Sequence, residues 1–254
     1  MGKSYPTAIL QIRTGSTRLP GKMLMPFHNN CSIPELIIER IKTVLPAANI
    51  LVATTLSKKD DPIEELALKL GVKCFRGDEN DVLKRFLDAM EHFDLHNVMR
   101  ICADNPFLSA EYLQTLITEF QNSEYDYISF EFPDGTPIMR SHIGLFAEIM
   151  RADFLKKIAS STQEALYREH VTNYVYEHKA LFKTLFLPVP LPFANRQDIR
   201  LTIDTAGDFN AAQNLFSTLF NRNPDFSADD LLQAIDSNHA LLQSMKTQIA
   251  LNSK

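Results

Sequence analysis

The sequence predicts an α/β fold in which a mostly parallel sheet carries helices on both faces. Short apolar segments alternate with segments of helical periodicity four times in the first half of the chain, which is typical of strand–helix–strand units. A loop rich in glycine and positive charge follows the first apolar segment. Ligands of such folds bind at the carboxyl ends of the strands. We therefore expect the functional site at that edge of the sheet.

Four strands and four helices are expected before residue 121. The strands are expected at Thr7 to Ile12, Ile50 to Thr54, Val72 to Phe75 and Val98 to Cys102. The helices are expected from the capping box Ser32 to Glu35 onward, from Asp61 to a stop at Gly71, from Val82 to Glu91, and from Ala110 to Phe120. This order predicts that the four strands are parallel.

The pattern is less regular between residues 126 and 192, which we interpret as an insertion into a domain that spans residues 1–225. Strands are expected here at Tyr127 to Phe130, Gly144 to Ile149 and Phe182 to Val189, and a helix at Gln163 to His178. After the insertion we expect a strand from Arg200 to Ile203 and a helix from Gly207 to Phe220. Residues 226–254 form a helical extension, in which an amphipathic helix from Ala228 to Ile249 is expected to serve packing alone.

The composition argues against several classes of protein. The chain has 254 residues, a formal net charge of −5 and a pI of about 5.8, so it lacks the basic surface of a nucleic-acid-binding protein. Its three cysteines show neither CxxC spacing nor an even count, which favours reduced thiols. No apolar run is long enough to span a membrane, so we expect a soluble, cytoplasmic protein.

The segment from Gln11 to Lys22 is the strongest functional signal. It combines three cations with two glycines, Gly15 and Gly21, which are able to adopt positive φ and let backbone N–H groups approach an anion. The cations suited to phosphate oxygens are Arg13, Arg18 and Lys22. The spacing differs from the Walker pattern. The segment predicts a polyphosphate site, and the alternative is an exposed basic turn.

Two carboxylates are candidate ligands for Mg²⁺. Asp104 follows the fourth expected strand and Asp204 follows the expected strand after the insertion, so both belong at the edge that carries the basic loop. Mg²⁺ prefers one or two carboxylates together with phosphate oxygens and water. The alternative for each aspartate is a helix cap or an Asx turn. His170, beside Arg168, either orients a substrate or lies on a solvated helix surface.

Five segments, in order along the chain, resemble the spore-coat polysaccharide biosynthesis protein F group of cytidylyltransferase-like proteins, which are related to CMP-sugar synthetases. The segments are Gln11 to Lys22, Asp81 to Phe86, Ala103 to Pro106, Arg168 to Thr172 and Arg200 to Phe209. The resemblance covers most of residues 5–220. It implies a Rossmann-like, glycosyltransferase-A-type nucleotidyltransferase fold with a dimerisation segment inserted at about residues 126–192.

The resemblance also implies roles for individual residues. The implied reaction is transfer of CMP from CTP to an acidic keto-sugar with release of pyrophosphate, in surface polysaccharide or glycan biosynthesis. The implied catalytic residues are Arg13, Lys22, Asp104 and Asp204, with Mg²⁺ on Asp104 and Asp204. The implied nucleotide-binding residues are Ile12, Arg13, Gly15, Ser16, Arg18, Lys22, Asp81 and Asp104, and the proposed sugar contacts are Arg140, Arg168 and His170. A homodimer joined through residues near 130–190 is expected.

The chain departs from the pattern of the group at three places. Ile12 and Ala103 replace smaller residues, and the segment from Thr136 to Arg140 stands where relatives often carry an acidic run. Two alternatives therefore stay open: a glycosyltransferase that uses a finished nucleotide sugar, and a non-catalytic protein that binds a nucleotide sugar. Release of pyrophosphate distinguishes the cytidylyltransferase from both.

Overall fold

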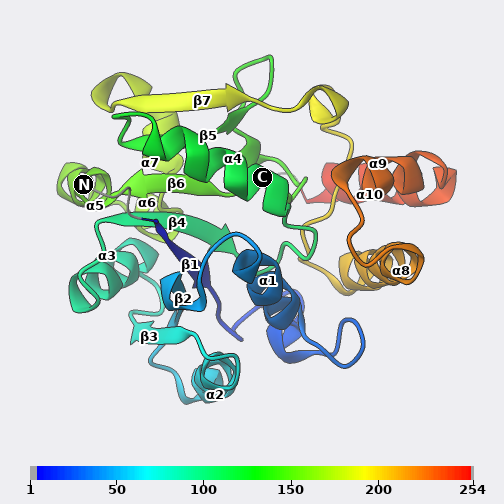
Figure 1. Ribbon diagram of the computed structural model, residues 1–254, viewed down its shortest axis with the longest axis horizontal. Helices are drawn as coiled ribbons and strands as arrows, with labels where there is room; N and C mark the ends of the chain where they lie inside the picture. The colour runs from blue at the N-terminus through cyan, green and yellow to red at the C-terminus, as the bar shows by residue number, and fades with distance from the viewer. Residues whose placement is uncertain (1–4, 253–254) are drawn as a thin grey trace.

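The computed structural model describes residues 5–252, which form one seven-stranded sheet with helices on both faces (Figure 1). The strands are β1 (Thr7–Gln11), β2 (Ile50–Thr55), β3 (Lys73–Gly77), β4 (Asn97–Cys102), β5 (Tyr127–Glu131), β6 (Glu148–Arg151) and β7 (Thr184–Pro188). Their order across the sheet is β3-β2-β1-β4-β6-β5-β7. Only β6 runs antiparallel to its neighbours, so the mostly parallel α/β fold is confirmed.

Ten α-helices complete the described part of the chain. They are α1 (Ile33–Lys42), α2 (Asp61–Lys69), α3 (Val82–His92), α4 (Ala110–Gln121), α5 (Ala152–Ser161), α6 (Ala165–Glu169), α7 (Asn173–Glu177), α8 (Ala206–Arg222), α9 (Ala228–Asp236) and α10 (His239–Leu251). The predicted alternation from β1 to α4 is confirmed. Within residues 5–252, no helix combines the length and the apolar character needed to cross a membrane.

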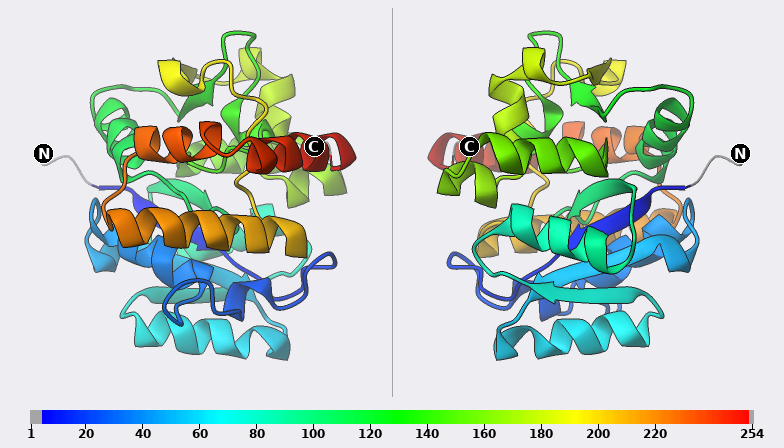
Figure 2. Two further views of the ribbon diagram at one scale, coloured as in Figure 1. Left: turned by 90° about the vertical axis from the view of Figure 1, so that its right-hand side faces the viewer. Right: turned by 90° about the vertical axis from the view of Figure 1, so that its left-hand side faces the viewer.

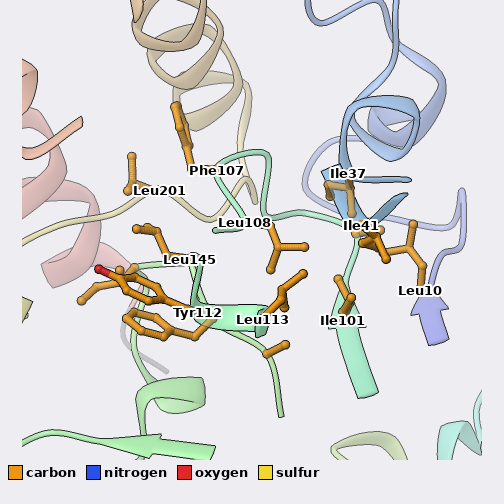
Figure 3. Close-up of a cluster of buried hydrophobic side chains, with 14 of the residues drawn as sticks. Leu10, Ile37, Ile41, Ile101, Phe107, Leu108, Tyr112, Leu113, Leu145 and Leu201 are labelled. Atoms are coloured by element: carbon orange, nitrogen blue, oxygen red, sulfur yellow. The ribbon is translucent and has the colours of Figure 1, made fainter. Parts of the chain in front are cut away.

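The sheet separates two apolar layers because its buried strands point alternate side chains to opposite faces. Leu10 and Ile101 face one layer, where they meet α1, α4 and α8, whereas Ile9 and Val98 face α3, α5 and α7. Figure 3 shows the centre of the first layer, where Leu201 and Phe107 join the leucines and isoleucines of the sheet and helices. Helices α8, α9 and α10 lie together at one side of the molecule (Figure 2).

Local sequence signals set several boundaries as expected. The capping box of Ser32 and Glu35 begins α1, and Gly71 follows α2 with φ 68°, the left-handed conformation that glycine tolerates. Residues 127–188 supply β5, β6 and β7 to the same sheet as the first four strands. The segment interpreted as an insertion therefore extends the central sheet.

The strand predicted from Arg200 to Ile203 is wrong. Apolar residues alternate here, at Leu201 and Ile203, which produced the strand-like pattern, but every residue from Arg200 to Ile203 is buried. The backbone N–H groups of this segment donate to loop carbonyls: Leu201 and Thr202 to His142 at 2.8 and 3.1 Å, and Ile203 to Asp104 at 3.0 Å. The segment is thus buried between loops without belonging to the sheet.

Two helical predictions also need correction. The helix expected from Gln163 to His178 is divided into α6 and α7 by a turn at residues 170–172, and the helix expected from Ala228 to Ile249 is divided by Ser237 and Asn238. Asn238 begins α10 by accepting a hydrogen bond from the backbone of Leu241 at 3.0 Å. Helix α5 was not predicted.

Candidate functional site

The loop that follows β1 is fixed at its base by a buried aspartate. Asp60, which is 2% exposed, accepts hydrogen bonds from the backbone N–H of Thr14 at 2.8 Å and from its hydroxyl at 2.6 Å. Burial opposes ionisation of Asp60, but the hydrogen bonds from Thr14 and Thr55 outweigh it and lower the pKa. Asp60 was not predicted to hold the loop, because the Asp61-Pro62 pair beside it indicates only the start of a helix.

The two glycines of the loop differ in conformation. Gly21 has φ 73° and precedes a short 3-10 turn that begins at Lys22, as expected for a glycine in a tight turn. Gly15 does not have positive φ, so that expectation is wrong for this residue. Between the two glycines, the Ser16 hydroxyl accepts a hydrogen bond from the backbone N–H of Leu19 at 3.2 Å, which links the two sides of the turn.

Lys22 points from this loop toward the two predicted carboxylates. It is 7% exposed, and its Nζ donates to the carbonyl of Ile203 and lies 3.9 Å from Oδ2 of Asp104. The hydrogen bond from Ile203 N–H to the Asp104 carbonyl holds the two chain segments together. The structure therefore brings Lys22, Asp104 and the residue before Asp204 into one place.

Asp204 lies between two arginines. Arg18 Nη2 contacts one carboxylate oxygen at 2.9 Å and Arg200 Nη2 contacts the other at 3.0 Å. The Arg200 side chain is almost wholly buried and also forms two 2.8 Å hydrogen bonds with Asp208. Arg18 is half exposed, so it is able to leave Asp204 for a ligand at modest cost.

A pocket of about 580 Å³ lies beside these residues. Of the residues predicted for the site, its lining contains Arg18, Asp104, Arg140, His170 and Asp204. Apolar side chains from Ile138, Met139, Phe146 and Leu166 form part of its wall. The mixture of fixed charges and apolar surface is typical of a site for a small molecule.

The remaining predicted residues lie outside the lining of this pocket, and one of them, Ile12, is buried in the apolar core. Arg168 Nε contacts Asp81 at 2.6 Å, and Arg13 Nη2 lies 3.5 Å from Glu169. Asp81 also caps α3 by accepting from the backbone of Lys84 at 2.8 Å. These contacts link α6 to both the basic loop and the start of α3. Arg168 itself provides the link between α6 and α3.

Arg85, in the same motif as Asp81, is fully buried beside the basic loop. Its Nη1 donates to the carbonyl of Asp78 at 2.6 Å, whereas Nε and Nη2 have no hydrogen-bond partner among the residues that the structure describes. Burial and, next, the charge of Arg13 lower the pKa of Arg85 to about 10. Such a buried and incompletely paired guanidinium at the rim of the loop was not predicted.

A second unpredicted group lies in the wall of the pocket. Arg100 on β4 pairs with Glu148 on β6, and Tyr176 and Thr172 also bond to Glu148. Arg100, Thr172 and Tyr176 line the pocket. The one signal in the sequence is Glu148 itself, since a carboxylate inside the apolar run from Leu145 to Met150 needs a buried partner.

The comparison with known proteins identifies the family. A sequence profile described as cytidylyltransferase matches residues 7–247. The chain belongs to the cytidylyltransferase family. It is therefore a nucleotidyltransferase, which agrees with the cations and carboxylates gathered around the pocket.

Two relatives resemble this cytidylyltransferase over most of its length. The spore coat polysaccharide biosynthesis protein SpsF of Bacillus subtilis is 34% identical over 237 residues, which covers 91% of this chain and 93% of the relative. An uncharacterized protein of Methanocaldococcus jannaschii is 39% identical over 201 residues, or 79% of each chain. The resemblance to the protein F group expected from the motifs is confirmed.

Solved structures confirm the fold of the cytidylyltransferase. A cytidylyltransferase from Leptospira borgpetersenii superposes with a TM-score of 0.81 at 29% identity and covers 94% of this chain and 97% of its own. A CMP:2-keto-3-deoxy-manno-octonic acid synthetase complexed with CTP has a TM-score of 0.63 at 15% identity, with 85% and 99% covered, which shows a shared fold alone.

Proposed function

We propose that the protein transfers CMP from CTP to an acidic keto-sugar, with release of pyrophosphate, in the synthesis of a surface polysaccharide or glycan. The observation that carries the proposal is that Arg18, Asp104 and Asp204 face one pocket while Lys22 reaches toward Asp104. Membership of the cytidylyltransferase family and the similarity to SpsF and to the CMP-sugar synthetase support CTP as the nucleotide and polysaccharide synthesis as the pathway class.

The nucleotide end of the site is assigned to the loop after β1. Arg18 is exposed and able to turn from Asp204 to a phosphate, whereas Lys22 is held in place by the Ile203 carbonyl. Arg13 is also exposed and lies 3.5 Å from Glu169. Two exposed guanidinium groups and one buried ammonium suit a triphosphate, whose charge is spread over many oxygens.

Asp104 and Asp204 are the proposed ligands of Mg²⁺. Both present carboxylate oxygens to the same pocket, and oxygen is the donor that this hard cation prefers. Within residues 5–252, no group of three or more histidine, cysteine, aspartate or glutamate side chains forms a metal site by itself, so phosphate oxygens and water would complete the coordination. When bound, the ion would neutralise charge on the triphosphate.

The reaction then depends on position and charge. A sugar hydroxyl attacks the α-phosphorus of CTP, the bond to the pyrophosphate oxygen breaks, and the hydroxyl proton passes to Asp204. Lys22 and Arg18 stabilise the negative charge that accumulates on the phosphate oxygens and on the leaving pyrophosphate. Electrostatic stabilisation of this kind is the main contribution that proteins make to phosphoryl-type transfer.

The sugar end of the site is assigned to the wall formed by α6, α7 and the 3-10 turn at residues 138–140. Arg140 and His170 line the pocket there. Arg140 is bonded to Glu177 at 2.8 Å and lies over the ring of Tyr176. Arg168 is bonded to Asp81, so we propose that it affects sugar binding indirectly, by holding α6 in position.

The test is a measurement of pyrophosphate release from CTP, UTP, GTP and ATP with Mg²⁺ and a set of acidic keto-sugars. We expect release with CTP and at least one sugar, and a loss of roughly 100-fold or more in the Asp104→Asn variant, since an active-site charge contributes several kcal/mol to the transition state. A surface variant, Asp153→Asn, serves as control because its carboxylate is almost fully exposed. Sugar transfer without pyrophosphate would identify a glycosyltransferase instead.

We also propose that the protein is a homodimer joined through residues near 130–190. Strand β7 lies at the edge of the sheet, with β5 on one side only. Leu181 and Leu191, on either side of β7, are 52% and 90% exposed. Unpaired edge strands with apolar neighbours favour association. Light scattering at micromolar concentration is expected to give twice the mass of the chain, and a monomer would contradict the proposal.

A further inference from the structure

Arg100 is a buried cation at the floor of the candidate pocket. It faces Glu148 across the antiparallel pair β4 and β6, and the two residues are direct partners in the register. Arg100 is 9% exposed and Glu148 is fully buried. Since Arg100, Cys102 and Asp104 all line the pocket, alternate positions of β4 and its extension face the same space.

Glu148 holds Arg100 in one position. The carboxylate accepts hydrogen bonds from Arg100 Nη1, Tyr127 at 2.6 Å, Thr172 at 3.1 Å and Tyr176 at 3.0 Å. Burial and then Glu148 raise the pKa of Tyr127, so its hydroxyl remains a donor. Burial by itself lowers the pKa of Arg100, but the charges of Cys102 and Glu148 raise it by more. The pKa therefore lies above its ordinary value and the guanidinium stays charged.

This network leaves a donor of Arg100 unused. Within residues 5–252, the buried Nε of Arg100 has no hydrogen-bond partner, while Nη1 bonds to Glu148. An unmet buried donor is costly, and a buried ion pair is often no more stabilising than apolar residues of the same volume. A fixed, incompletely bonded guanidinium at the wall of a pocket therefore points to a ligand that supplies the missing acceptor.

The other cations of the pocket are less suited to that role. Arg140 is 39% exposed and bonds to Glu177, so its guanidinium has to be ordered again when a ligand binds. Arg18 contacts Asp204 and is assigned to the phosphates. His170 lies in the turn between α6 and α7. Arg100 is the lining cation whose position is already fixed by a buried network.

We propose that Arg100, held by Glu148, binds the carboxylate of the acceptor and makes the pocket specific for acidic sugars. The proposal rests on the proposed function and names the residue that selects the substrate class. Arg100 lines the pocket, so its guanidinium is able to donate a charge-assisted hydrogen bond to the carboxylate and gain an acceptor that the protein does not supply. Thr172 and Tyr176 line the same wall, so the carboxylate would also meet their hydroxyl groups.

The experiment is a calorimetric titration of the protein with 2-keto-3-deoxy-manno-octonic acid, with a shorter and a longer 2-keto-3-deoxy sugar acid, and with the methyl ester of each. Mg²⁺ and CMP are present to occupy the nucleotide end without reaction. We expect the wild type to bind at least one acid roughly 10- to 100-fold more tightly than its ester, which is the usual effect of one hydrogen bond between charged groups. In Arg100→Met this preference is expected to disappear.

Two further variants separate binding from folding. Arg100→Met alone leaves Glu148 buried and uncompensated, so the double variant Arg100→Met/Glu148→Gln, which buries no charge, is measured beside it. Arg151→Met is the matched control, because Arg151 lies at the end of β6 and packs over Phe120 away from the pocket. We expect the double variant to fold and lack the preference, and the control to keep it.

The outcomes distinguish this inference from the proposed function. If the wild type does not prefer any acid to its ester, or if a folded Arg100 variant keeps the preference, Arg100 does not select the substrate. CTP binding by the same proteins is recorded separately. Loss of the acid preference with intact CTP binding supports the inference, whereas failure of the wild type to bind CTP would overturn the proposed function itself.

Discussion

Asp208 shows how one side chain organises the site from outside the pocket. Its carboxylate accepts from Arg200 at 2.8 Å and from the backbone of Asp204 and Thr205 at 3.1 and 2.9 Å. It thereby caps α8 and orients Arg200, which in turn contacts Asp204. Burial raises the pKa of Asp208, but these hydrogen bonds more than compensate and lower it overall.

The lowered pKa of Asp208 predicts a pH-dependent contribution to stability. Because the folded pKa is below the unfolded value, the contribution is present above the ordinary aspartate range and is lost as the pH falls through the folded pKa. Asp208→Asn is expected to reduce the free energy of unfolding by about 3 kcal/mol at pH 7, since it leaves buried Arg200 with one carboxylate, Asp204. Urea titrations at pH 7 and pH 3 measure the difference, which should shrink at pH 3.

Asp153→Asn is the control for this prediction. Asp153 pairs with Lys156, and both side chains are largely exposed, so the change in stability is expected to stay within about 0.5 kcal/mol at either pH. A destabilisation by Asp208→Asn that is equally large at pH 3 and pH 7 would show that shape and hydrogen-bond geometry, not charge, govern the Asp208 contribution.

The predicted residues that the structure brings together are those whose signal is local. Lys22 and Asp104 lie in short motifs next to strand ends, and the alternation of elements places them at one edge. Arg100 and Glu148 are 48 residues apart and meet only because β6 enters the sheet beside β4. A strand is expected from Gly144 to Ile149 and Glu148 indicates a buried partner, but no local signal says which strand lies beside it, so the pairing with Arg100 was not predictable.

At the scale of elements, the errors have a common cause. Ile203 belongs to an apolar alternating segment that is buried between loops, and its backbone bonds to Asp104 rather than to a strand. Residues 170–172 carry no glycine or proline, yet the chain turns there, with Val171 and Thr172 buried. Tertiary burial overrides the local pattern in both places, and both places form the wall of the pocket.

The turn before β6 is predicted to control the shape of the pocket through Gly144. Gly144 has φ 65°, and a Cβ at this position would lie 2.9 Å from Oδ1 of Asn105 and 3.3 Å from Thr202. Gly144→Ala is therefore expected to cost about 1–2 kcal/mol in backbone strain and more for the contact. Because Gly144 and Asn105 line the pocket, the rate of pyrophosphate release should fall roughly tenfold or more.

Gly135→Ala provides the matched comparison. Gly135 also has positive φ, at 80°, but a Cβ there would meet no atom within 4 Å. The same backbone strain is expected without the displacement of Asn105, so activity should stay within about twofold of the wild type. Equal losses of activity in the two variants would show that the contact with Asn105 is not the cause.

At the scale of the whole molecule, the site is assembled from three distant parts of the chain. The loop after β1 brings Arg18, the end of β4 brings Asp104, and the segment before α8 brings Asp204. Opposite charges meet here: Arg18 pairs with Asp204, and Lys22 approaches Asp104. The groups proposed to bind phosphate and those proposed to bind Mg²⁺ thus neutralise each other without ligand.

This mutual neutralisation predicts that CTP and Mg²⁺ stabilise the fold together more than the sum of their separate effects. Each ligand alone has to separate Arg18 from Asp204 and gives a new partner to only one of the two, whereas both ligands together give a new partner to each. At 100 times the dissociation constant, the complex should gain about 2.7 kcal/mol, which corresponds to a rise in Tm of roughly 5–10 °C. Scanning calorimetry with CTP, Mg²⁺ and both measures the coupling. In Arg18→Gln, which removes this ion pair and keeps both proposed ligands of Mg²⁺, the excess of the joint gain over the sum of the separate gains should vanish. A purely additive response of the wild type would contradict the prediction.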